Sequence, residues 1–324
     1  MNDGVTFYPH AMPDPHVTIV LRCFNEAWAL RHTLDALTSQ EYRNWQLIAV
    51  DSGSTDGSAE LLRAANPRHL VELLPHDYRP GRVLNLGMEL AATERVIFLN
   101  ADATPQNSHW LRPLVEALQP PDVAAVFGRQ VPRPDCHAVY ASDYERCFGE
   151  KRESAGWDHF FSMVSSGLRK DIWLERGFLE SMQYSEDDEY TRWCRSRGYR
   201  IVYRADSVVM HSHNYTAHQA YRRSFGEAWA LAAVSRAGES RLPSRTRLAL
   251  GWANDVRRDF TFCRRSGRLR EWPHAAAIRW QQRLGRRDGF LAGWGMHGGT
   301  LANDDGHPAA PREELARCAT CNSE

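Results

Sequence analysis

The strongest constraint on the fold of this 324-residue chain is an alternation of apolar runs with amphipathic segments in its first hundred residues. The apolar runs are rich in β-branched residues, as buried strands are, and cover residues 17–23, 45–51, 71–75 and 95–100. The segments between them have a helical period and cover residues 26–39, 58–65 and 82–92. Asn25 is the expected N-cap of the first of these helices. Strands that alternate with helices predict βαβ units and an α/β fold with a mostly parallel sheet.

Further strands and helices are predicted beyond residue 100. The predicted helices are 109–118, 170–176 and 187–197, and the predicted strands are 123–131 and 161–168. Residues 200–213 fit either a strand or a hairpin, and residues 132–160 show no clear period. From residue 218 to 285 we expect several helices, with breaks near Pro243 and Pro273.

Charge and composition divide the chain into four parts. Residues 1–217 carry 22 basic and 29 acidic residues, whereas residues 218–288 carry 16 basic and 6 acidic ones. We expect a loose leader, an α/β domain, a basic helical segment and a mobile tail. Their expected bounds are 1–15, 16–217, 218–290 and 291–324. A basic segment after an acidic domain favours an anionic partner for that segment, such as a membrane surface.

Composition excludes several classes of protein. Apolar residues make up 43 % and charged residues 25 % of the chain, close to globular averages and far from those of disordered or collagen-like chains. No apolar run approaches the ~18–20 residues of a membrane span, and the first ten residues do not read as a signal peptide. Seven scattered cysteines suit a reducing compartment. We therefore expect a cytoplasmic protein.

Two aspartates follow predicted parallel strands, at the edge where α/β sheets bind their ligands. Asp51 opens the turn DSGSTDGS, where its carboxylate can accept hydrogen bonds from a ribose or a base N–H. Asp102 follows the strand 95–100, where it can hold Mg²⁺ or Mn²⁺ against a diphosphate. A role in a turn or a helix cap explains either aspartate equally well.

Three other groups of polar residues are candidates for chemistry. Residues 186–189 are four carboxylates at a helix start, where the helix dipole favours them but their repulsion raises one pKa toward that of a base. His211 and His213 share one face of a predicted strand, where they either bind a metal or pack in the structure. Arg79 and Arg82 precede a helix and can pair with a phosphate or with a surface carboxylate.

The order of these motifs resembles that of family 2 glycosyltransferases, which have the GT-A fold. The motifs are TIVLRCFNE, IAVDSGSTDGS, GRVLNLGMELA, VIFLNADATP, SEDDEYTRW and HSHNYT. The resemblance covers about residues 16–225, and FGRQVPRP and HSHNYT are most similar to bacterial rhamnosyltransferase-like members. It implies a mostly parallel central sheet flanked by helices, followed by a C-terminal helical segment.

The resemblance also implies roles for individual residues. The donor would be a nucleotide-diphosphate sugar, bound by Phe24, Glu26, Asp51, Arg82, Ser166 and Gly167. Asp102 would hold Mg²⁺ or Mn²⁺, with His211, or His213 in its place, as a further ligand. Asp187, in one motif with Glu186, would deprotonate an acceptor hydroxyl. A single in-line displacement would then invert the anomeric centre, and retention is the alternative that these residues leave open.

The chain departs from the family pattern near these residues. Arg22 stands where the family often has proline, and Asn100-Ala101-Asp102 replaces the Asp-x-Asp motif. One carboxylate is missing, so the metal site is either weaker or completed by His211 and water. The QxxRW motif of processive polymerases is absent, because residues 219–223 read QAYRR, which favours a single-transfer enzyme.

Two other functions are compatible with parts of the sequence. The reduced metal motif favours a non-catalytic nucleotide-sugar-binding or scaffold protein, although the retained Asp187 speaks against it. A nucleotidyltransferase also uses a strand-end aspartate and Mg²⁺. It would carry a glycine-rich basic loop directly after the first strand, where this chain reads RCFNEA.

The resemblance and the distribution of charge also predict the kind of acceptor and the contacts of the C-terminal segment. The resemblance implies a surface-glycan or lipid-linked acceptor, and we expect no nucleic acid partner. Residues 218–290 either pack on the α/β domain or lie on the anionic inner membrane. One helical face of this segment would make that contact, and its residues are Leu248, Trp252, Val256, Phe260 and Cys263.

Overall fold

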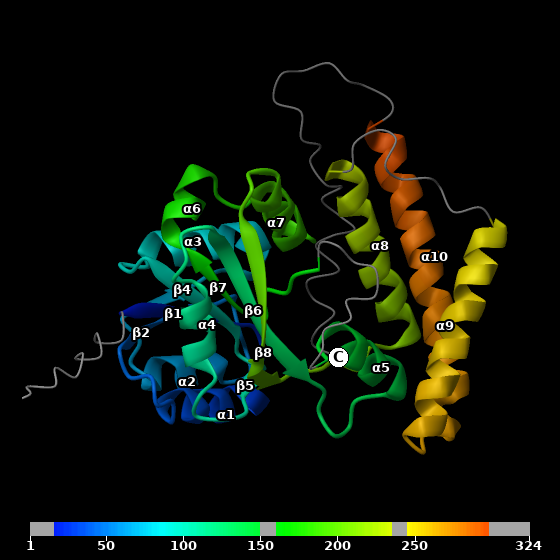
Figure 1. The fold of residues 1–324 in the computed structure, drawn as a ribbon, viewed down its shortest axis with the longest axis horizontal. Helices are drawn as coiled ribbons and strands as arrows, with labels where there is room; N and C mark the ends of the chain where they lie inside the picture. Colours follow the sequence, from blue (N-terminus) through cyan, green and yellow to red (C-terminus); the bar gives the residue numbers. More distant parts are fainter. Residues whose placement is uncertain (1–15, 150–159, 235–244, 298–324) are drawn as a thin grey trace, which may run out of the picture.

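The computed structural model describes residues 16–149, 160–234 and 245–297 of the chain. One eight-stranded sheet forms its centre, helices cover both faces, and three long helices stand together at one side (Figure 1). The strands are β1 (Val17–Cys23), β2 (Trp45–Asp51), β3 (His69–Glu72), β4 (Arg95–Asn100), β5 (Thr104–Pro105), β6 (Val123–Val131), β7 (Ser165–Arg169) and β8 (Arg200–Met210). The helices are α1 (Ala27–Thr38), α2 (Ser58–Ala64), α3 (Pro80–Leu90), α4 (Leu111–Ala117), α5 (Ala138–Cys147), α6 (Lys170–Glu175), α7 (Glu186–Ser196), α8 (Ala217–Val234), α9 (Arg245–Arg265) and α10 (Trp272–His297), with the short 3-10 turns η1 (Pro75–Asp77) and η2 (Leu269–Glu271).

The strand order across the sheet is β3-β2-β1-β4-β7-β6-β8-β5. The pairs β3/β2, β2/β1, β1/β4 and β6/β8 are parallel. Strand β7 runs antiparallel to both of its neighbours, and β5 runs antiparallel to β8. The sheet is therefore mostly parallel, and the predicted α/β fold class is confirmed.

The register of the sheet brings the ends of three parallel strands together. Arg22 at the end of β1 lies opposite Val50 of β2 and Asn100 of β4. Its neighbour Cys23 lies opposite Asp51, the last residue of β2. Polar residues that the sequence places just after these strands are thereby gathered along one edge of the sheet.

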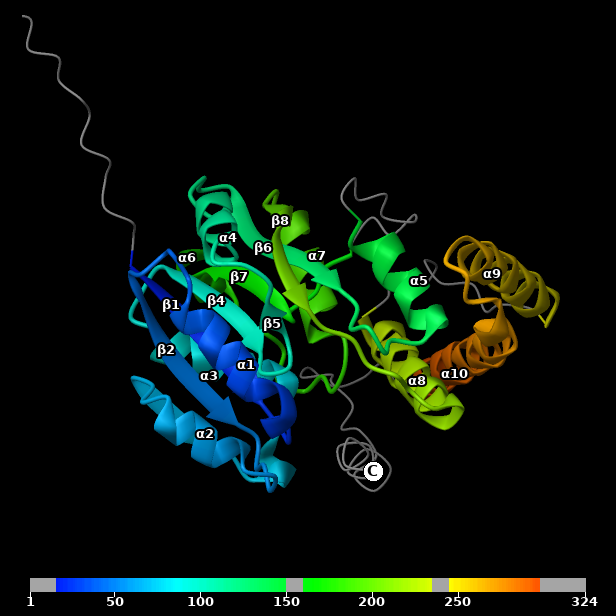
Figure 2. The same ribbon diagram turned by 90° about the horizontal axis from the view of Figure 1, so that it is seen from below.

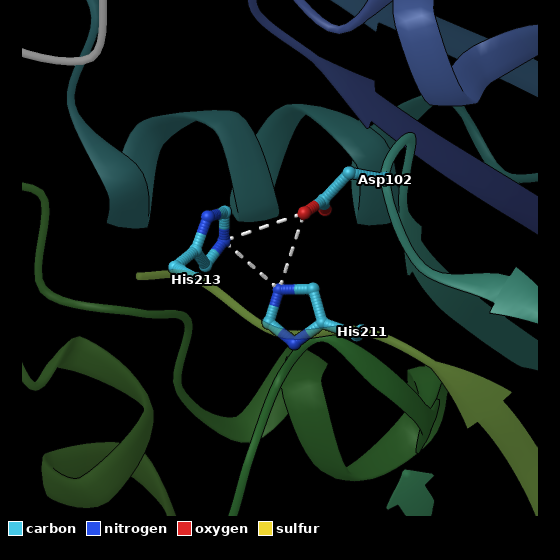
Figure 3. A group of neighbouring side chains, drawn as sticks. All are labelled: Asp102, His211 and His213. Atoms are coloured by element: carbon cyan, nitrogen blue, oxygen red, sulfur yellow. Dashed lines mark hydrogen bonds and ion pairs between the residues drawn. The ribbon is translucent and has the colours of Figure 1, made fainter. Parts of the chain in front are cut away.

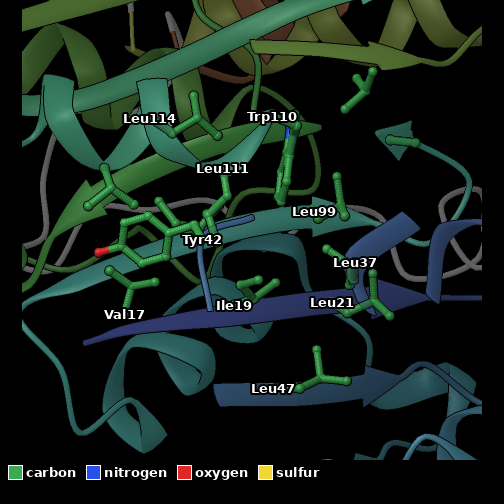
Figure 4. Packing of buried hydrophobic residues seen from close by; sticks show 14 of the residues in the cluster. Val17, Ile19, Leu21, Leu37, Tyr42, Leu47, Leu99, Trp110, Leu111 and Leu114 are labelled. Atoms are coloured by element: carbon green, nitrogen blue, oxygen red, sulfur yellow. The ribbon is translucent and has the colours of Figure 1, made fainter. Parts of the chain in front are cut away.

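Helices lie on both sides of the sheet (Figure 2), and each face buries its own apolar cluster, one of which is drawn in part in Figure 4. Ile19 and Leu21 of β1 pack on one side with residues of α1, α2 and α4. Val20 points to the other side, where residues of α3, α6 and α7 cover the sheet. Because both faces are covered, β1 is a continuous apolar run rather than an alternating one.

The C-terminal helices α8 and α10 approach each other closely through glycines. A Cβ atom added at Gly285 or Gly289 of α10 would lie 2.2 or 2.1 Å from the carbonyl oxygen of Tyr221 or Phe225 of α8. Gly293 is similarly close to Trp229. The glycines recur every four residues, so they form one stripe along α10, and the backbones meet there without side chains between them.

The predicted apolar face of α9 packs against α10. The indole N–H of Trp252 donates to the carbonyl of Ala276 at 2.9 Å, and that of Trp272 donates to the carbonyl of Val256 at 3.1 Å. The rings of Phe260 and Trp272 meet edge to face, with 5.2 Å between their centroids. Within the described ranges, every helix falls short of the length and apolar character that a membrane span requires.

The structure differs from the sequence predictions in several elements. Residues 132–160, left unassigned from the sequence, contain α5, and β8 is one strand rather than a hairpin. Strand β3 begins before the predicted residue 71. Helix α10 continues to His297, into the segment predicted as a tail. The predicted leader, the break at Pro243 and the tail beyond His297 lie outside the described residues.

Candidate active site

Asp51 is committed to the turn that it opens. One carboxylate oxygen accepts hydrogen bonds from the backbone N–H groups of Gly53 at 3.1 Å and Ser54 at 2.9 Å. The other accepts the Ser54 hydroxyl at 2.5 Å. Only 2 % of Asp51 is exposed. The geometry thus shows the turn-forming role, and the contact with a nucleobase or ribose stays a prediction.

The prediction that Asn25 caps α1 is wrong, because the following loop supplies the cap instead. Asn25 has a left-handed φ of 53°, and its side-chain oxygen accepts the N–H of Thr55 at 2.8 Å. Asp56 accepts the N–H of Ala27, in the first turn of α1, at 2.9 Å. Its other oxygen accepts the Ser58 hydroxyl at 2.7 Å at the start of α2. Asp56 therefore holds the two loops together at the predicted nucleotide-binding edge.

Asp102, His211 and His213 form a compact group (Figure 3). One carboxylate oxygen of Asp102 lies 3.4 Å from Nε2 of His211 and 3.3 Å from Nε2 of His213. The two Nε2 atoms lie 3.1 Å apart. The loop after β4 and the segment after β8 thus bring three ligand atoms to one point, although 109 residues separate Asp102 from His211 in the sequence.

A second layer of polar residues fixes the orientation of His211. Its Nδ1 atom lies 2.9 Å from the side-chain oxygen of Gln130 and 3.0 Å from the hydroxyl of Tyr144. The Gln130 amide is itself oriented, because its N–H donates to the Ser162 hydroxyl at 2.8 Å. With the proton of neutral His211 on Nδ1, the lone pair of Nε2 faces Asp102, as in a metal-ligating histidine.

The electrostatics of the group suit a bound cation. Burial lowers the pKa of His211 to about 3 and that of His213 to about 4, so both imidazoles are neutral at pH 7. Burial also raises the pKa of Asp102. Neither carboxylate oxygen of Asp102 has a hydrogen-bond partner of good geometry in the described part of the chain, although the side chain is buried and the Glu26 carboxyl lies near enough to lower its pKa. A divalent cation would satisfy these orphaned oxygens, so the residues present fit a metal ion.

Glu26 lies beside the group formed by Asp102, His211 and His213, whereas the sequence predicted that it contacts the nucleoside. Burial and then the negative charge of Asp102 raise the pKa of Glu26 to about 9. One of its carboxylate oxygens is buried and accepts no hydrogen bond from the residues described. Sequence reasoning missed this proximity to Asp102, because it depends on how α1 is seated beside the loop after β4.

Glu186 and Asp187 begin α7, directly after Ser185, which adopts a left-handed φ of 61°. Burial and the neighbouring charge of Asp187 raise the pKa of Glu186 to about 7. Burial likewise raises the pKa of Asp187. Glu186 therefore titrates near neutral pH, in the range of a general base, beside an Asp187 whose pKa is also raised.

The charge of Arg22 acts on carboxyls of both groups of the site, since it lowers the pKa values of Glu26 and of Glu186. Its guanidinium donates to the side-chain oxygen of Asn100 at 2.6 Å and to the carbonyl of Met163 at 3.3 Å. Its positive charge lowers the pKa values of Glu186 and Asp187 against the larger effect of burial. The two departures from the family pattern, Arg22 and Asn100, are thus direct partners.

Asn85 anchors the segment that leads to α7. Its side-chain oxygen accepts the backbone N–H of Phe178 at 2.8 Å and the indole N–H of Trp173 at 3.0 Å. Its amide N–H donates to the carbonyl of Phe178 and to the Glu180 carboxylate, each at 3.0 Å. The motif GRVLNLG therefore supports the acidic helix from the neighbouring α3.

The other residues predicted to bind the donor differ in how deeply they are buried. Ser166 and Gly167 lie inside β7, and the Ser166 side chain is fully buried. A Cβ at Gly167 would meet the side chain of Ile97 at 2.7 Å, so this glycine serves strand packing. The proximity of Ser166 and Gly167 to the donor sugar stays a prediction. Arg82 is exposed on the first turn of α3, and Phe24 is half-buried in the loop after β1.

Comparisons with known proteins identify the family. Residues 18–176 match the model of Glycosyl transferase family 2. The O-antigen chain rhamnosyltransferase RfbN of Salmonella typhimurium is 29 % identical over 222 residues, which are 64 % of this chain and 70 % of that protein. The O-antigen chain rhamnosyltransferase WbaN of Salmonella anatum is 27 % identical over 65 % of this chain and 70 % of its own length.

A solved structure supports the same fold. The mannosyltransferase PcManGT of Pyrobaculum calidifontis, in complex with GDP-Man and Mn²⁺, superposes with a TM-score of 0.57 at 20 % identity. The match covers 87 % of this chain and 90 % of that chain. The predicted GT-A-type architecture is thereby confirmed. The family model and the relatives together show that residues 18–176 are a glycosyl transferase family 2 domain and that this chain is a glycosyltransferase.

Proposed function

We propose that this glycosyltransferase moves a sugar from a nucleotide-diphosphate donor to an acceptor hydroxyl, with a divalent cation held by Asp102, His211 and His213. One observation carries the proposal. A carboxylate oxygen of the buried Asp102 and the Nε2 atoms of two neutral imidazoles converge on one point, 3.1 to 3.4 Å from one another. In a family 2 glycosyltransferase such a group is suited to hold the cation that binds the donor diphosphate.

The donor set favours Mn²⁺ over Mg²⁺. Mg²⁺ prefers an all-oxygen shell, whereas two of the three ligand atoms here are imidazole nitrogens. When bound, the cation supplies positive charge that stabilises the departing diphosphate. The structural neighbour of Pyrobaculum calidifontis was solved with Mn²⁺, which supports this choice.

Asp187 is the base of this proposal. Its carboxylate accepts the proton of the acceptor hydroxyl as that oxygen attacks the anomeric carbon, and the bond to the diphosphate breaks in the same step. Glu186 beside it has a pKa raised to about 7, and Arg22 limits the rise of both pKa values. A single displacement of this kind inverts the anomeric centre.

The donor sugar of the proposal is rhamnose, and the acceptor is a surface-glycan intermediate, including a lipid-linked one. The support is the similarity to two O-antigen chain rhamnosyltransferases, over about two-thirds of this chain. The single-transfer prediction from residues 219–223 fits a glycan that is built one sugar at a time.

Slow hydrolysis of the donor, with water as acceptor, tests the proposal without a known acceptor. The protein would be incubated with Mn²⁺ and dTDP-rhamnose, UDP-glucose or GDP-mannose, and early products would be followed by proton NMR. We expect turnover of dTDP-rhamnose with inversion, and none with Asp187→Asn. Binding of a nucleotide without hydrolysis of any donor would favour the scaffold function instead.

A further inference from the structure

Arg133 lies in the segment after β6 and contacts both chain segments that carry the candidate metal ligands. Its guanidinium donates to the backbone carbonyl of Asp102. It also donates to the carbonyl of Ser212, the residue between His211 and His213, at 2.8 Å. The backbone N–H of Arg133 donates to the Ser212 hydroxyl at 3.0 Å. Arg133 is therefore hydrogen-bonded to both of the segments that carry Asp102, His211 and His213.

These bonds begin where the sheet ends. Strands β5 and β8 pair only through Thr104 with Met210 and Pro105 with Val209. The candidate ligands lie just beyond this short ladder, on the loop before β5 and on the segment after β8. The hydrogen bonds of Arg133 join the same two segments beyond the last residue pair of this ladder, next to the candidate ligands.

The guanidinium binds the main chain and leaves the carboxylate free. Its Nη1 atom lies 3.9 Å from Oδ2 of Asp102, which is too far for a hydrogen bond. Both oxygens of Asp102 consequently keep their lone pairs for another partner. Arginine suits this task, because its rigid fork of donors reaches two carbonyls at once, which a single ammonium group does not reproduce.

Trp28 shields this arrangement from solvent. The indole ring lies 4.5 Å from the guanidinium carbon of Arg133, whose side chain is 13 % exposed. Trp28 itself is 59 % exposed, in the first turn of α1. The Trp28 ring therefore restrains the guanidinium of Arg133 from the solvent side, where it is not part of the apolar core.

We propose that Arg133 is a positioning residue of the cation site, which fixes the spacing of Asp102, His211 and His213, and that Trp28 holds Arg133 in place. The inference rests on the proposed cation site. It adds that the affinity for the cation depends on two main-chain bonds from a residue that is not a ligand. The charge of Arg133 by itself would act the other way, because a nearby positive charge disfavours a dication.

Mn²⁺ binding to the full chain, measured by electron paramagnetic resonance without nucleotide, tests this inference. Arg133→Lys keeps the charge but loses the fork, and we expect Mn²⁺ to bind about 10- to 100-fold more weakly, as with other partners that orient metal ligands. Arg133→Met loses the fork and the charge, so its loss of affinity should be smaller. Trp28→Ala, an exposed change, should weaken binding about two- to fivefold.

Two controls separate the possible outcomes. Arg112→Lys makes the same substitution at another arginine stacked on an aromatic ring, Tyr42, at 5.3 Å, and should bind Mn²⁺ like the wild type. Asp102→Asn should abolish binding. If Asp102→Asn abolishes binding while Arg133→Lys binds normally, or if Arg133→Met binds more tightly, the positioning role is overturned and the cation site stands. If the wild type binds no Mn²⁺, both proposals are overturned.

Discussion

The carboxylates of the site differ in what surrounds them, although Asp102 and Glu186 are both buried and Asp187 is half-buried. Asp102 faces two imidazoles and a guanidinium that leaves its oxygens free. Glu186 and Asp187 face each other and the charge of Arg22. One environment is suited to a cation and the other to a proton, so we assign cation binding to Asp102 and proton transfer to the pair.

Asp187→Asn tests the proton-transfer role most simply. The amide has the shape of the carboxylate but does not accept a proton, so we expect kcat to fall about 10²- to 10⁴-fold. Nucleotide affinity should remain, because Asp187 is assigned to the acceptor side. Steady-state kinetics and calorimetric titration of the nucleotide would measure the two effects. An equal loss of affinity and turnover would contradict the assignment.

The pH dependence of the reaction follows from the raised pKa of Glu186. A group with a pKa of about 7 binds a proton below that pH, and the pair then loses its basic form. Activity should therefore be present above pH 7 and fall as the pH decreases through about 7. In Glu186→Gln the repulsion on Asp187 disappears, so the fall should move to lower pH. A profile of kcat/KM at saturating Mn²⁺ that is the same for both proteins would argue against this coupling.

At the scale of elements, the close approach of α8 and α10 makes Gly289 sensitive to any side chain. Replacing glycine by alanine inside a helix ordinarily stabilises it by about 1 kcal/mol. Here the new methyl group would meet the Phe225 carbonyl, since an added Cβ lies 2.1 Å from that oxygen. We expect Gly289→Ala to lower the free energy of unfolding by about 1–3 kcal/mol, as overpacked cores do. Urea denaturation measures the sign, and a stabilised variant would contradict the packing described.

A buried ion-pair network joins α5, α9 and α10. Arg279 of α10 donates to Asp259 of α9 at 2.7 Å and to Asp143 of α5 at 2.6 Å, and only 4 % of the arginine is exposed. Arg279→Met would leave the buried Asp259 without this cation, whereas Asp143 keeps its pair with Arg146 at 3.2 Å, and we expect a loss of about 3–5 kcal/mol in unfolding free energy. The double variant Arg279→Met/Asp259→Asn should recover part of that loss. A single variant as stable as the wild type would show that the network contributes nothing.

The elements differ in how well the sequence predicts them. Strands β1, β2, β4 and β6 begin and end at the predicted residues, because long apolar β-branched runs have few alternatives. Helix α5 gave no periodic signal, because its buried side includes polar residues such as Ser142, and Asp143 is an ion-pair partner of α10. The cap of α1 was mispredicted for a related reason. It comes from Asp56, in a loop that is near only in the fold.

At the scale of the whole molecule, some arginines of the basic C-terminal segment form ion pairs with carboxylates of the acidic domain. Arg265 of α9 pairs with Glu145 of α5 at 2.5 Å, and Arg279 pairs with Asp143 of the same helix. The basic segment is thus attached to the acidic domain by ion pairs as well as by apolar packing. The sequence alone suggested an external anionic partner, because it does not reveal which charges meet in the fold.

The candidate site also depends on the whole topology. Asp102 and His211 were predicted ligands, and the strand order β4-β7-β6-β8 brings the ends of distant strands to one group. Residue type and strand position were sufficient to nominate these two residues. The proximity of Glu26 and the contacts of Arg133 were not predictable, since they depend on loop conformations that no local pattern encodes.

Thermal unfolding with nucleotides and Mn²⁺ tests the central claim most directly. The wild type and Asp102→Asn would be melted with dTDP, UDP or GDP, each with and without Mn²⁺. A nucleotide at 100 times its Kd adds about 2.7 kcal/mol of stability, which gives a measurable rise in Tm. We predict that one nucleotide raises the Tm of the wild type only when Mn²⁺ is present, and leaves Asp102→Asn unchanged. Equal stabilisation without Mn²⁺, or in Asp102→Asn, would contradict a donor site built on this cation.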